Sequence, residues 1–183
     1  MIGMATMGKR SSFERIPRDF YPTPAEAVAP LLAHLLPGTR FVEPCAGDGR
    51  LSNHLMAAGH HMIDQYDIAP QHPTVTAGDA TLDRIDPTWG AHCFITNPPW
   101  DRKVLHPLIV NLSDQMPTWL LFDADWIHTR QAGPFLPRLR RIVSVGRVKW
   151  IPDSKMTGKD NCAWHLFDRP SANDAAMFYG RAA

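Results

Sequence analysis

A rigid polar turn lies in the middle of the chain, where Asn97-Pro98-Pro99-Trp100 directly follows the apolar residues 93–96. Neither proline donates a backbone hydrogen bond, and each ring fixes φ near about −65°, so the turn is stiff. The Asn97 side-chain carbonyl and the Pro98 backbone carbonyl are then free acceptors. An amino group on an aromatic ring that donated to both would lose conjugation with its ring, and its lone pair would become nucleophilic. Trp100 offers a face for stacking a planar substrate.

A second group of residues is typical of a cofactor site. The segment Phe41 to Gly49 reads Phe-Val-Glu-Pro-Cys-Ala-Gly-Asp-Gly. Glycines between a strand and a helix let the backbone approach a ligand and leave helix N–H groups free to bind it. Asp67 comes 18 residues after Gly49, where a carboxylate can accept hydrogen bonds from both hydroxyls of a ribose. Asp79 ends the next expected strand, where it would face the edge of an adenine. Together these residues indicate an adenosine-containing cofactor.

Strands that alternate with helices must bring these residues to one edge of a sheet. Thr23 is expected to cap the first helix, with Pro24 at its first position. Alternation of this kind predicts an α/β fold with a mainly parallel sheet. Two final strands, 141–148 and 162–167, have no helix between them and predict an antiparallel hairpin at one edge. The other expected strands are 40–43, 62–66, 74–77, 93–96 and 119–122, and the expected helices are 25–36, 50–58 and 104–112.

Composition points to one folded domain. The chain has 183 residues, of which 44% are hydrophobic and 20% are charged, which is typical of a globular protein. Residues 1–17 lack periodicity and are expected to form a flexible N-terminal segment, with one domain over 18–183. The chain has no apolar run near the roughly 18 residues of a membrane span and no signal-peptide core, so a cytoplasmic location is expected. The three cysteines lie far apart, and neither a disulfide framework nor a metal site is expected.

These motifs, taken in order, give the chain a family resemblance. It resembles the S-adenosylmethionine-dependent amino-methyltransferases, and most closely the small phage-type adenine-N6 DNA methyltransferases. The resemblance covers about residues 19–168 and includes a segment, Asp19 to Pro24, that reads Asp-Phe-Tyr-Pro-Thr-Pro. It implies a Rossmann-like class I methyltransferase sheet with a C-terminal antiparallel hairpin. It also implies S-adenosyl-L-methionine as cofactor, S-adenosyl-L-homocysteine as product, no metal, and the cytoplasm of a host if the chain is phage-encoded.

The resemblance further implies the role of each motif. The catalytic turn would be Asn97, Pro98, Pro99 and Trp100, with the first two binding the target amine and the tryptophan stacking on its base. Because the sulfonium gives an uncharged leaving group, transfer depends on positioning and polarising the amine more than on a strong base. The implied cofactor-binding residues are Phe20, Tyr21, Thr23, Pro24, Glu43, Ala46, Gly47, Gly49, Asp67 and Asp79.

The acceptor is less closely defined by the sequence. The formal net charge is only +1, but the run from Arg138 to Lys159 holds seven Lys and Arg residues against one acid. Such a run can contact phosphates, or it can form an ordinary solvated hairpin face. Trp126 follows the fifth expected strand and can flank a flipped base or pack as a core residue. The candidate substrate-binding residues are Trp126, Arg147, Lys149, Lys155, Lys159 and Asn161.

The small size of the chain leaves several substrates open. The catalytic core uses nearly all of the sequence, so no separate target-recognition domain is expected. The leading hypothesis is methylation of adenine N6 in DNA, and the first alternative is the same reaction on a free adenine nucleotide such as dAMP. Further alternatives are an RNA or protein-glutamine methyltransferase and a non-catalytic module that binds S-adenosylmethionine. A monomer or homodimer with no membrane partner is expected.

Overall fold

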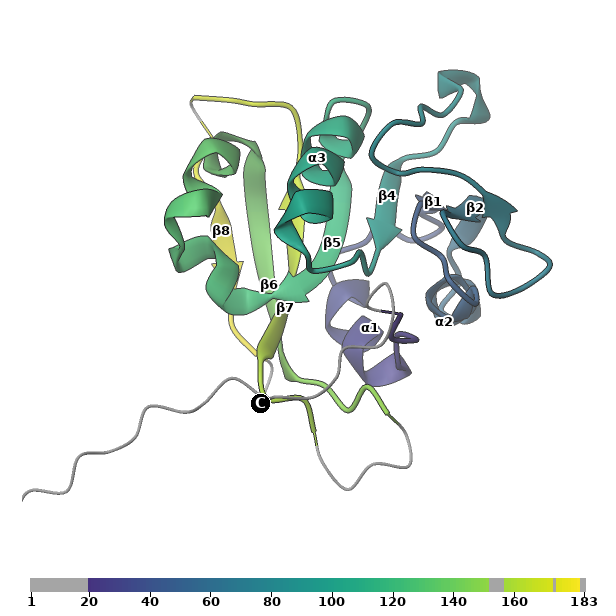
Figure 1. The fold of residues 1–183 in the computed structure, drawn as a ribbon, viewed down its shortest axis with the longest axis horizontal. Coiled ribbons are helices and arrows are strands. Elements are labelled where there is room, and N and C mark those ends of the chain that lie inside the picture. The colour runs from purple at the N-terminus through teal and green to yellow at the C-terminus, as the bar shows by residue number, and fades with distance from the viewer. Residues whose placement is uncertain (1–19, 152–156, 173, 182–183) are drawn as a thin grey trace, which may run out of the picture.

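The fold is seen in a computed structural model of the chain, which describes residues 20–151, 157–172 and 174–181. The N-terminal segment expected at 1–17 and the candidate residue Lys155 lie outside the described residues. The described part contains an eight-stranded sheet in the order β3-β2-β1-β4-β5-β7-β6-β8 (Figure 1). The strands are β1 (Arg40–Glu43), β2 (His61–Asp67), β3 (Thr76–Ala77), β4 (Cys93–Thr96), β5 (Thr118–Asp123), β6 (Leu139–Arg147), β7 (Asn161–Phe167) and β8 (Met177–Tyr179).

Strand directions confirm the predicted α/β architecture. β3, β2, β1, β4 and β5 pair in parallel, and β7 is antiparallel to both β5 and β6. The hairpin of β6 and β7 is not at the edge, however, because β8 pairs in parallel with the outer side of β6. The sequence analysis missed β8 because three residues are too short to show alternation, and its Met177 and Phe178 remain exposed.

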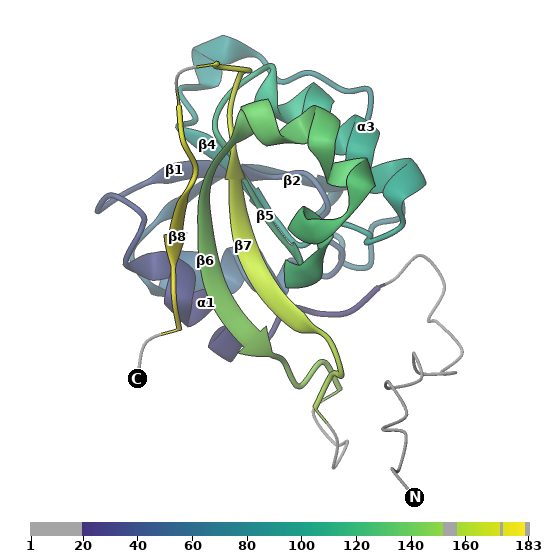
Figure 2. The ribbon, with the colours of Figure 1, turned by 90° about the vertical axis from the view of Figure 1, so that its left-hand side faces the viewer.

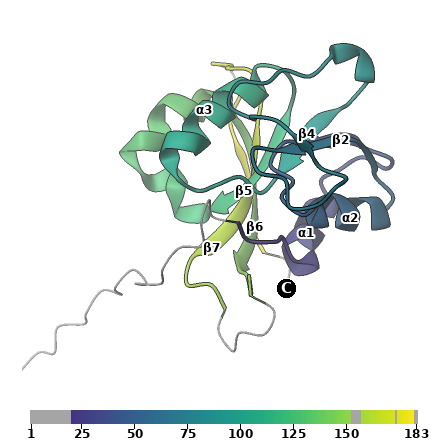
Figure 3. The same ribbon diagram turned by 45° about the vertical axis from the view of Figure 1, so that its right-hand side comes forward.

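Helices cover both faces of the sheet. The α-helices are α1 (Ala25–Leu32), α2 (Arg50–Ala57) and α3 (Arg102–Ser113), and the 3₁₀ segments are η2 (Pro87–Trp89), η3 (Ala124–His128) and η4 (Arg130–Arg138). α1 and α2 lie on one side of the sheet, and α3, η3 and η4 lie on the other (Figures 2 and 3). The first helix ends earlier than predicted, because His34 and Leu35 bond to carbonyls three residues back, which closes the last turn.

The core shows why the central strands are apolar throughout. Side chains alternate across β5, so Trp119 and Leu121 pack with residues of α1 and α2, while Leu120 and Phe122 pack with α3. Burial on both faces fixes the register of this strand, because a shift of one residue would exchange the two sets. The sheet therefore holds the carboxyl ends of β1, β2 and β4 in fixed positions.

Trp126 belongs to this core, and its expected contact with a substrate base is wrong. The side chain is 1% exposed and meets Phe122 edge-on, with ring centroids 5.3 Å apart. Its Nε1 donates to His106 Nε2 at 3.2 Å. Because η3 places Trp126 between the sheet, α3 and η4, its ring is not accessible to a substrate base.

Candidate functional site

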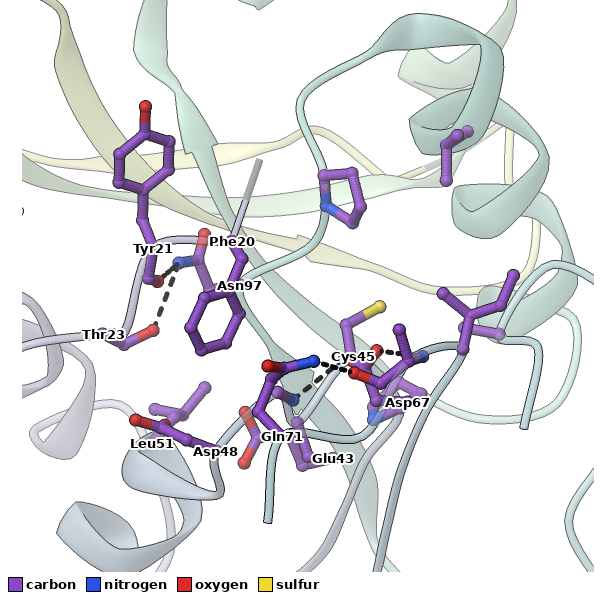
Figure 4. A pocket seen from close by; sticks show the side chains of 18 of the residues that line it. Phe20, Tyr21, Thr23, Glu43, Cys45, Asp48, Leu51, Asp67, Gln71 and Asn97 are labelled. Atoms are coloured by element: carbon purple, nitrogen blue, oxygen red, sulfur yellow. Dashed lines mark hydrogen bonds between the residues drawn. The ribbon is translucent and has the colours of Figure 1, made fainter. Parts of the chain in front are cut away.

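A cavity of about 590 Å³ lies at the carboxyl ends of β1, β2 and β4. Ligands of open α/β sheets bind at this edge. The residues that line the cavity come from separate parts of the sequence, and Figure 4 shows many of their side chains around one space. Among the sequence-predicted residues, the lining contains Phe20, Tyr21, Thr23, Glu43, Ala46, Gly47, Asp67, Asp79, Asn97 and Pro99.

The glycine turn and Asp67 form one hydrogen-bonded unit. Gly47 has a φ of +54°, and its N–H donates to Asp67 Oδ2 at 2.9 Å. The other carboxylate oxygen, Oδ1, accepts from the backbone N–H of Ala69 at 2.8 Å. A carboxylate oxygen has two lone pairs, so each still has the capacity to accept from a ligand hydroxyl. The strand end and the turn thus present acceptors at one place in the cavity.

Phe20 lies directly on this turn. A Cβ added to Gly47 would come within 2.5 Å of the Phe20 ring, so only glycine fits there. Figure 4 shows the ring next to Asn97. The segment Phe20 to Pro24, which we call the strap, therefore crosses from the glycine turn at Gly47 to the turn at Asn97.

Glu43 is a buried carboxyl at the end of β1. It is 1% exposed, and its Oε2 accepts from the Ser52 N–H at 2.9 Å and the Ser52 hydroxyl at 2.6 Å. Burial raises the pKa of Glu43 to about 8, against the opposing effect of the two Ser52 hydrogen bonds; the Asp48 and Asp67 carboxylates add to the rise. The carboxyl is thus mainly protonated at neutral pH, and a cation bound in the cavity would favour its ionised form.

Substitution Glu43→Gln is expected to flatten the pH dependence of folding stability. The pKa is about 8 in the folded state and near its ordinary value of 4.5 in the unfolded chain, so the folded state holds the extra proton between these values. Stability therefore falls as the pH rises from about 4.5 to 8. Glutamine does not titrate and loses this contribution. Urea unfolding at pH 5, 6.5 and 8 measures the difference, with Asp125→Asn as the exposed-carboxyl control. Parallel curves for wild type and Glu43→Gln would contradict the assignment.

The cavity lining also contains apolar side chains and a further acid. Ala80, Val104 and Leu108 line the cavity together with Asp79. Asp79 Oδ1 accepts from the Thr81 N–H at 2.9 Å and from its hydroxyl at 2.6 Å. Its Oδ2 forms no hydrogen bond with the part of the chain that the structure describes. An apolar slot with one free carboxylate oxygen suits a planar heterocycle that bears an amino group.

Asn97 follows β4 with its amide held in one orientation. Its Nδ2 donates to the Tyr21 carbonyl oxygen at 3.3 Å and to the Thr23 hydroxyl at 3.2 Å. A carbonyl oxygen only accepts, so nitrogen must face the strap and Oδ1 must lie on the other side (Figure 4). Pro98 is buried behind the turn, and Pro99 lines the cavity. The predicted cap at Thr23 is wrong, because Pro24 is the N-cap residue of α1 and the hydroxyl accepts from Asn97 instead.

Three aromatic side chains gather beside Asn97. Trp100 does not line the cavity but meets Trp150 edge-on, with centroids 6.2 Å apart. The rings of Trp150 and Tyr21 also lie close together, with centroids 6.3 Å apart. The backbone N–H of Lys149 donates to Glu26 Oε1 at 3.0 Å, which fastens this loop to α1. Trp150 was missed by the sequence analysis; its one signal is that it is the single aromatic residue in the basic run.

The remaining predicted residues lie around the cavity rather than in its wall. Pro24 and Gly49 are the N-cap residues of α1 and α2, so they position the strap and the turn. Arg147, Lys159 and Asn161 are exposed at the loop end of the β6–β7 hairpin. Sequence reasoning also missed lining residues that the loops after β2 and β3 contribute, among them Gln71, whose N–H donates to the Gly47 carbonyl at 2.9 Å.

Two further classes of feature are not found in the described ranges. These residues contain no group of three or more His, Cys, Asp or Glu side chains placed to hold a metal ion. They also contain no helix with the length and apolar character of a membrane span. Cys45 lines the cavity as a free thiol, and burial raises its pKa, so it stays protonated and uncharged.

Comparison with known proteins establishes the fold class. No protein-family model and no curated protein sequence matches the chain. A solved structure of a candidate RNA methyltransferase from Pyrococcus horikoshii aligns with a TM-score of 0.54 and 13% identity over 84% of this chain and 88% of that one. A candidate class I S-adenosylmethionine-dependent methyltransferase from Listeria monocytogenes aligns with a TM-score of 0.57 and 9% identity, over 94% of this chain and 68% of that one.

A larger protein shares the same core. The methyltransferase subunit of a type I restriction-modification system from Streptococcus thermophilus aligns with a TM-score of 0.54 and 10% identity, over 87% of this chain but only 47% of that one. At these identities the likeness concerns the fold alone. The predicted Rossmann-like sheet of the class I methyltransferases, with antiparallel strands in its C-terminal part, is confirmed.

Proposed function

We propose that this chain transfers a methyl group from S-adenosylmethionine to the exocyclic N6 amine of adenine, with DNA as the leading acceptor. The observation that carries the proposal is the fixed amide of Asn97. Its nitrogen donates hydrogen bonds to the strap. Its oxygen is therefore a preorganised acceptor at a turn that two prolines stiffen. Such an acceptor, next to a cavity with the shape and polarity for an adenosine cofactor, suits methylation of a ring-bound amine.

The cavity supports S-adenosylmethionine along its whole length. Asp79 and the apolar slot suit the adenine, the Asp67 carboxylate suits the ribose hydroxyls, and Gly47 with Glu43 suits the amino-acid end. A volume of about 590 Å³ is in the range of small-molecule sites. Because S-adenosylmethionine is a cation, its binding would favour the ionised form of Glu43. In calorimetric titrations, S-adenosylhomocysteine should bind at least about tenfold more tightly than ATP, which shares the adenosine only; equal affinities would contradict this placement.

The chain's own groups supply orientation and polarisation. When bound, the cofactor supplies an electrophilic methyl group and leaves as a neutral thioether. Asn97 Oδ1 and the Pro98 carbonyl accept the two N–H groups of the target amine, which draws its lone pair out of conjugation. The nitrogen then forms its bond to the methyl carbon as the carbon–sulfur bond breaks, and the product loses one proton to water. Tyr21, Trp100 and Trp150 provide aromatic surfaces for the base beside this point.

The hairpin favours a polynucleotide acceptor over a free nucleotide. Trp150 belongs to the aromatic group beside Asn97 and directly follows Lys149, so the basic run passes the acceptor side of the site at Lys149. Arg147 and Lys159 are exposed farther along the same hairpin, where the phosphates of a bound strand would meet them. A free adenine nucleotide is the alternative acceptor. The name of the Pyrococcus neighbour makes adenine in RNA the third acceptor to test.

The double variant Arg147→Ala/Lys159→Ala is expected to weaken DNA binding in a salt-dependent way. If each side chain contacts one phosphate, the slope of log affinity against log salt should decrease in magnitude by about 2, while dAMP binding stays unchanged. Fluorescence anisotropy with a labelled oligonucleotide between about 50 and 300 mM salt gives the slope. The control is Arg84→Ala/Arg130→Ala, which removes the same charge from exposed positions outside the hairpin. Equal slopes for the two double variants would exclude the hairpin as the phosphate contact.

A further inference from the structure

The strap and the catalytic turn are joined by a side-chain hydrogen bond between distant parts of the sequence. The Thr23 hydroxyl lies 3.2 Å from Asn97 Nδ2, across 74 residues of chain. Thr23 is only 4% exposed, so little water competes for this bond. The second acceptor for the same nitrogen is the Tyr21 backbone carbonyl, at 3.3 Å. Both bonds of the Asn97 amide nitrogen therefore end on the strap.

The Tyr21 carbonyl decides which way the amide faces, because it can only accept, and the Thr23 hydroxyl adds the second bond that holds the amide there. The oxygen and nitrogen of a carboxamide have nearly the same shape, so packing alone does not distinguish the two orientations. In the flipped orientation the Asn97 nitrogen would face the target amine, and two donors would oppose each other. Its oxygen would then face the Tyr21 carbonyl, which is another acceptor. Of the two acceptors, only the Thr23 hydroxyl belongs to a side chain, so only it can be removed by a substitution.

We propose that Thr23 is a positioning residue, which holds the Asn97 amide in place so that Oδ1 accepts from the target amine. The inference rests on the proposed function and deepens it, because it assigns Thr23 to the acceptor side of the site. The family resemblance places Thr23 at the cofactor, and the two assignments predict different kinetic effects. A residue that orients Asn97 alters kcat, whereas a residue that holds the cofactor alters the Kd of the cofactor.

The substitution Thr23→Val tests this assignment, because valine keeps the branched shape and removes the hydroxyl. One hydrogen bond of ordinary strength corresponds to a decrease in kcat of about five- to tenfold. The Kd of S-adenosylhomocysteine and the KM of the acceptor should stay within about twofold of wild type. Thr23→Ser keeps the hydroxyl and should restore kcat to within about twofold. Thr23→Ala is a second variant without the hydroxyl and should match Thr23→Val, should valine fail to fold.

A matched control exists outside the site. Thr39 is also 4% exposed, and its hydroxyl donates to the Leu36 carbonyl at 2.6 Å. Thr39→Val should lower thermal stability without changing kcat, which separates a general loss of a buried hydroxyl from the loss of orientation.

The possible results separate the inference from the proposed function. If wild type transfers no methyl group to any adenine substrate, the proposed function fails. If wild type is active and Thr23→Val keeps full kcat, the positioning role fails while the function stands. A raised cofactor Kd with an unchanged kcat would likewise overturn the role and place Thr23 at the cofactor, and a Thr23→Ser variant as slow as Thr23→Val would contradict the hydroxyl as the responsible group.

Discussion

Replacement of Asn97 by alanine is expected to lower kcat for methyl transfer at least about 100-fold, which is the usual loss when one preorganised polar group is removed from a transition state. The substitution removes Oδ1, the acceptor that the strap holds in place. The cofactor cavity keeps its glycine turn, Asp67 and Asp79, so the Kd of S-adenosylhomocysteine should stay within about twofold. Single-turnover transfer from labelled cofactor and calorimetric titration measure the two quantities on the same preparation.

The control for this variant is Asn53→Ala, because Asn53 is an exposed asparagine on α2 outside the cavity lining. It should leave both kcat and Kd unchanged. Full activity of the Asn97→Ala variant would exclude the proposed mechanism. A large loss of cofactor affinity in the same variant would assign Asn97 to cofactor binding instead.

Substitution Gly47→Ala is expected to weaken cofactor binding at least about tenfold. A non-glycine residue at positive φ costs about 1–2 kcal/mol, and the new methyl group would meet the Phe20 ring at 2.5 Å. The ring and the strap must then shift at the wall of the cavity, and the Gly47 N–H loses its alignment with Asp67. Titration with S-adenosylhomocysteine gives the affinity, and urea unfolding gives the stability.

Gly38 offers a matched control for the backbone effect. Its φ is +67°, but an added Cβ would find no atom nearer than His61 at 3.8 Å. Gly38→Ala should therefore lower stability by about 1 kcal/mol and leave cofactor affinity unchanged. Equal affinities for the two alanine variants would show that the contact of Phe20 with the turn is unimportant for the cofactor.

Much of the fold is encoded locally and was predicted from the sequence. β1 and β4 have the predicted bounds because each has two buried apolar residues at its centre and is followed within two residues by a proline. η3 and η4 were not predicted, since η3 is too short to show a helical period and the two prolines of η4 interrupt one. β8 was missed because its pairing with β6 joins segments about 35 residues apart and leaves little local pattern.

The candidate site was predictable where it depends on strand ends. Asp67 ends β2, Asp79 and Asn97 follow β3 and β4, and parallel strands bring their carboxyl ends to one edge. Contacts between distant segments were not predictable in this way. The bond from Asn97 to Thr23, the place of Trp150 beside Trp100 and the burial of Trp126 depend on how the strap, the hairpin and η3 pack.

Methyl transfer itself is the most direct test of this account. Full-length protein would be incubated with methyl-labelled S-adenosylmethionine and, in parallel, adenine-containing DNA, the matched RNA and dAMP, and the products would be hydrolysed and separated as nucleosides. The account predicts label in N6-methyladenine from DNA. Label only in dAMP or only in RNA would keep the chemistry and replace the proposed acceptor. Cofactor binding without label in any of the three would contradict the central claim that this site methylates the adenine amine.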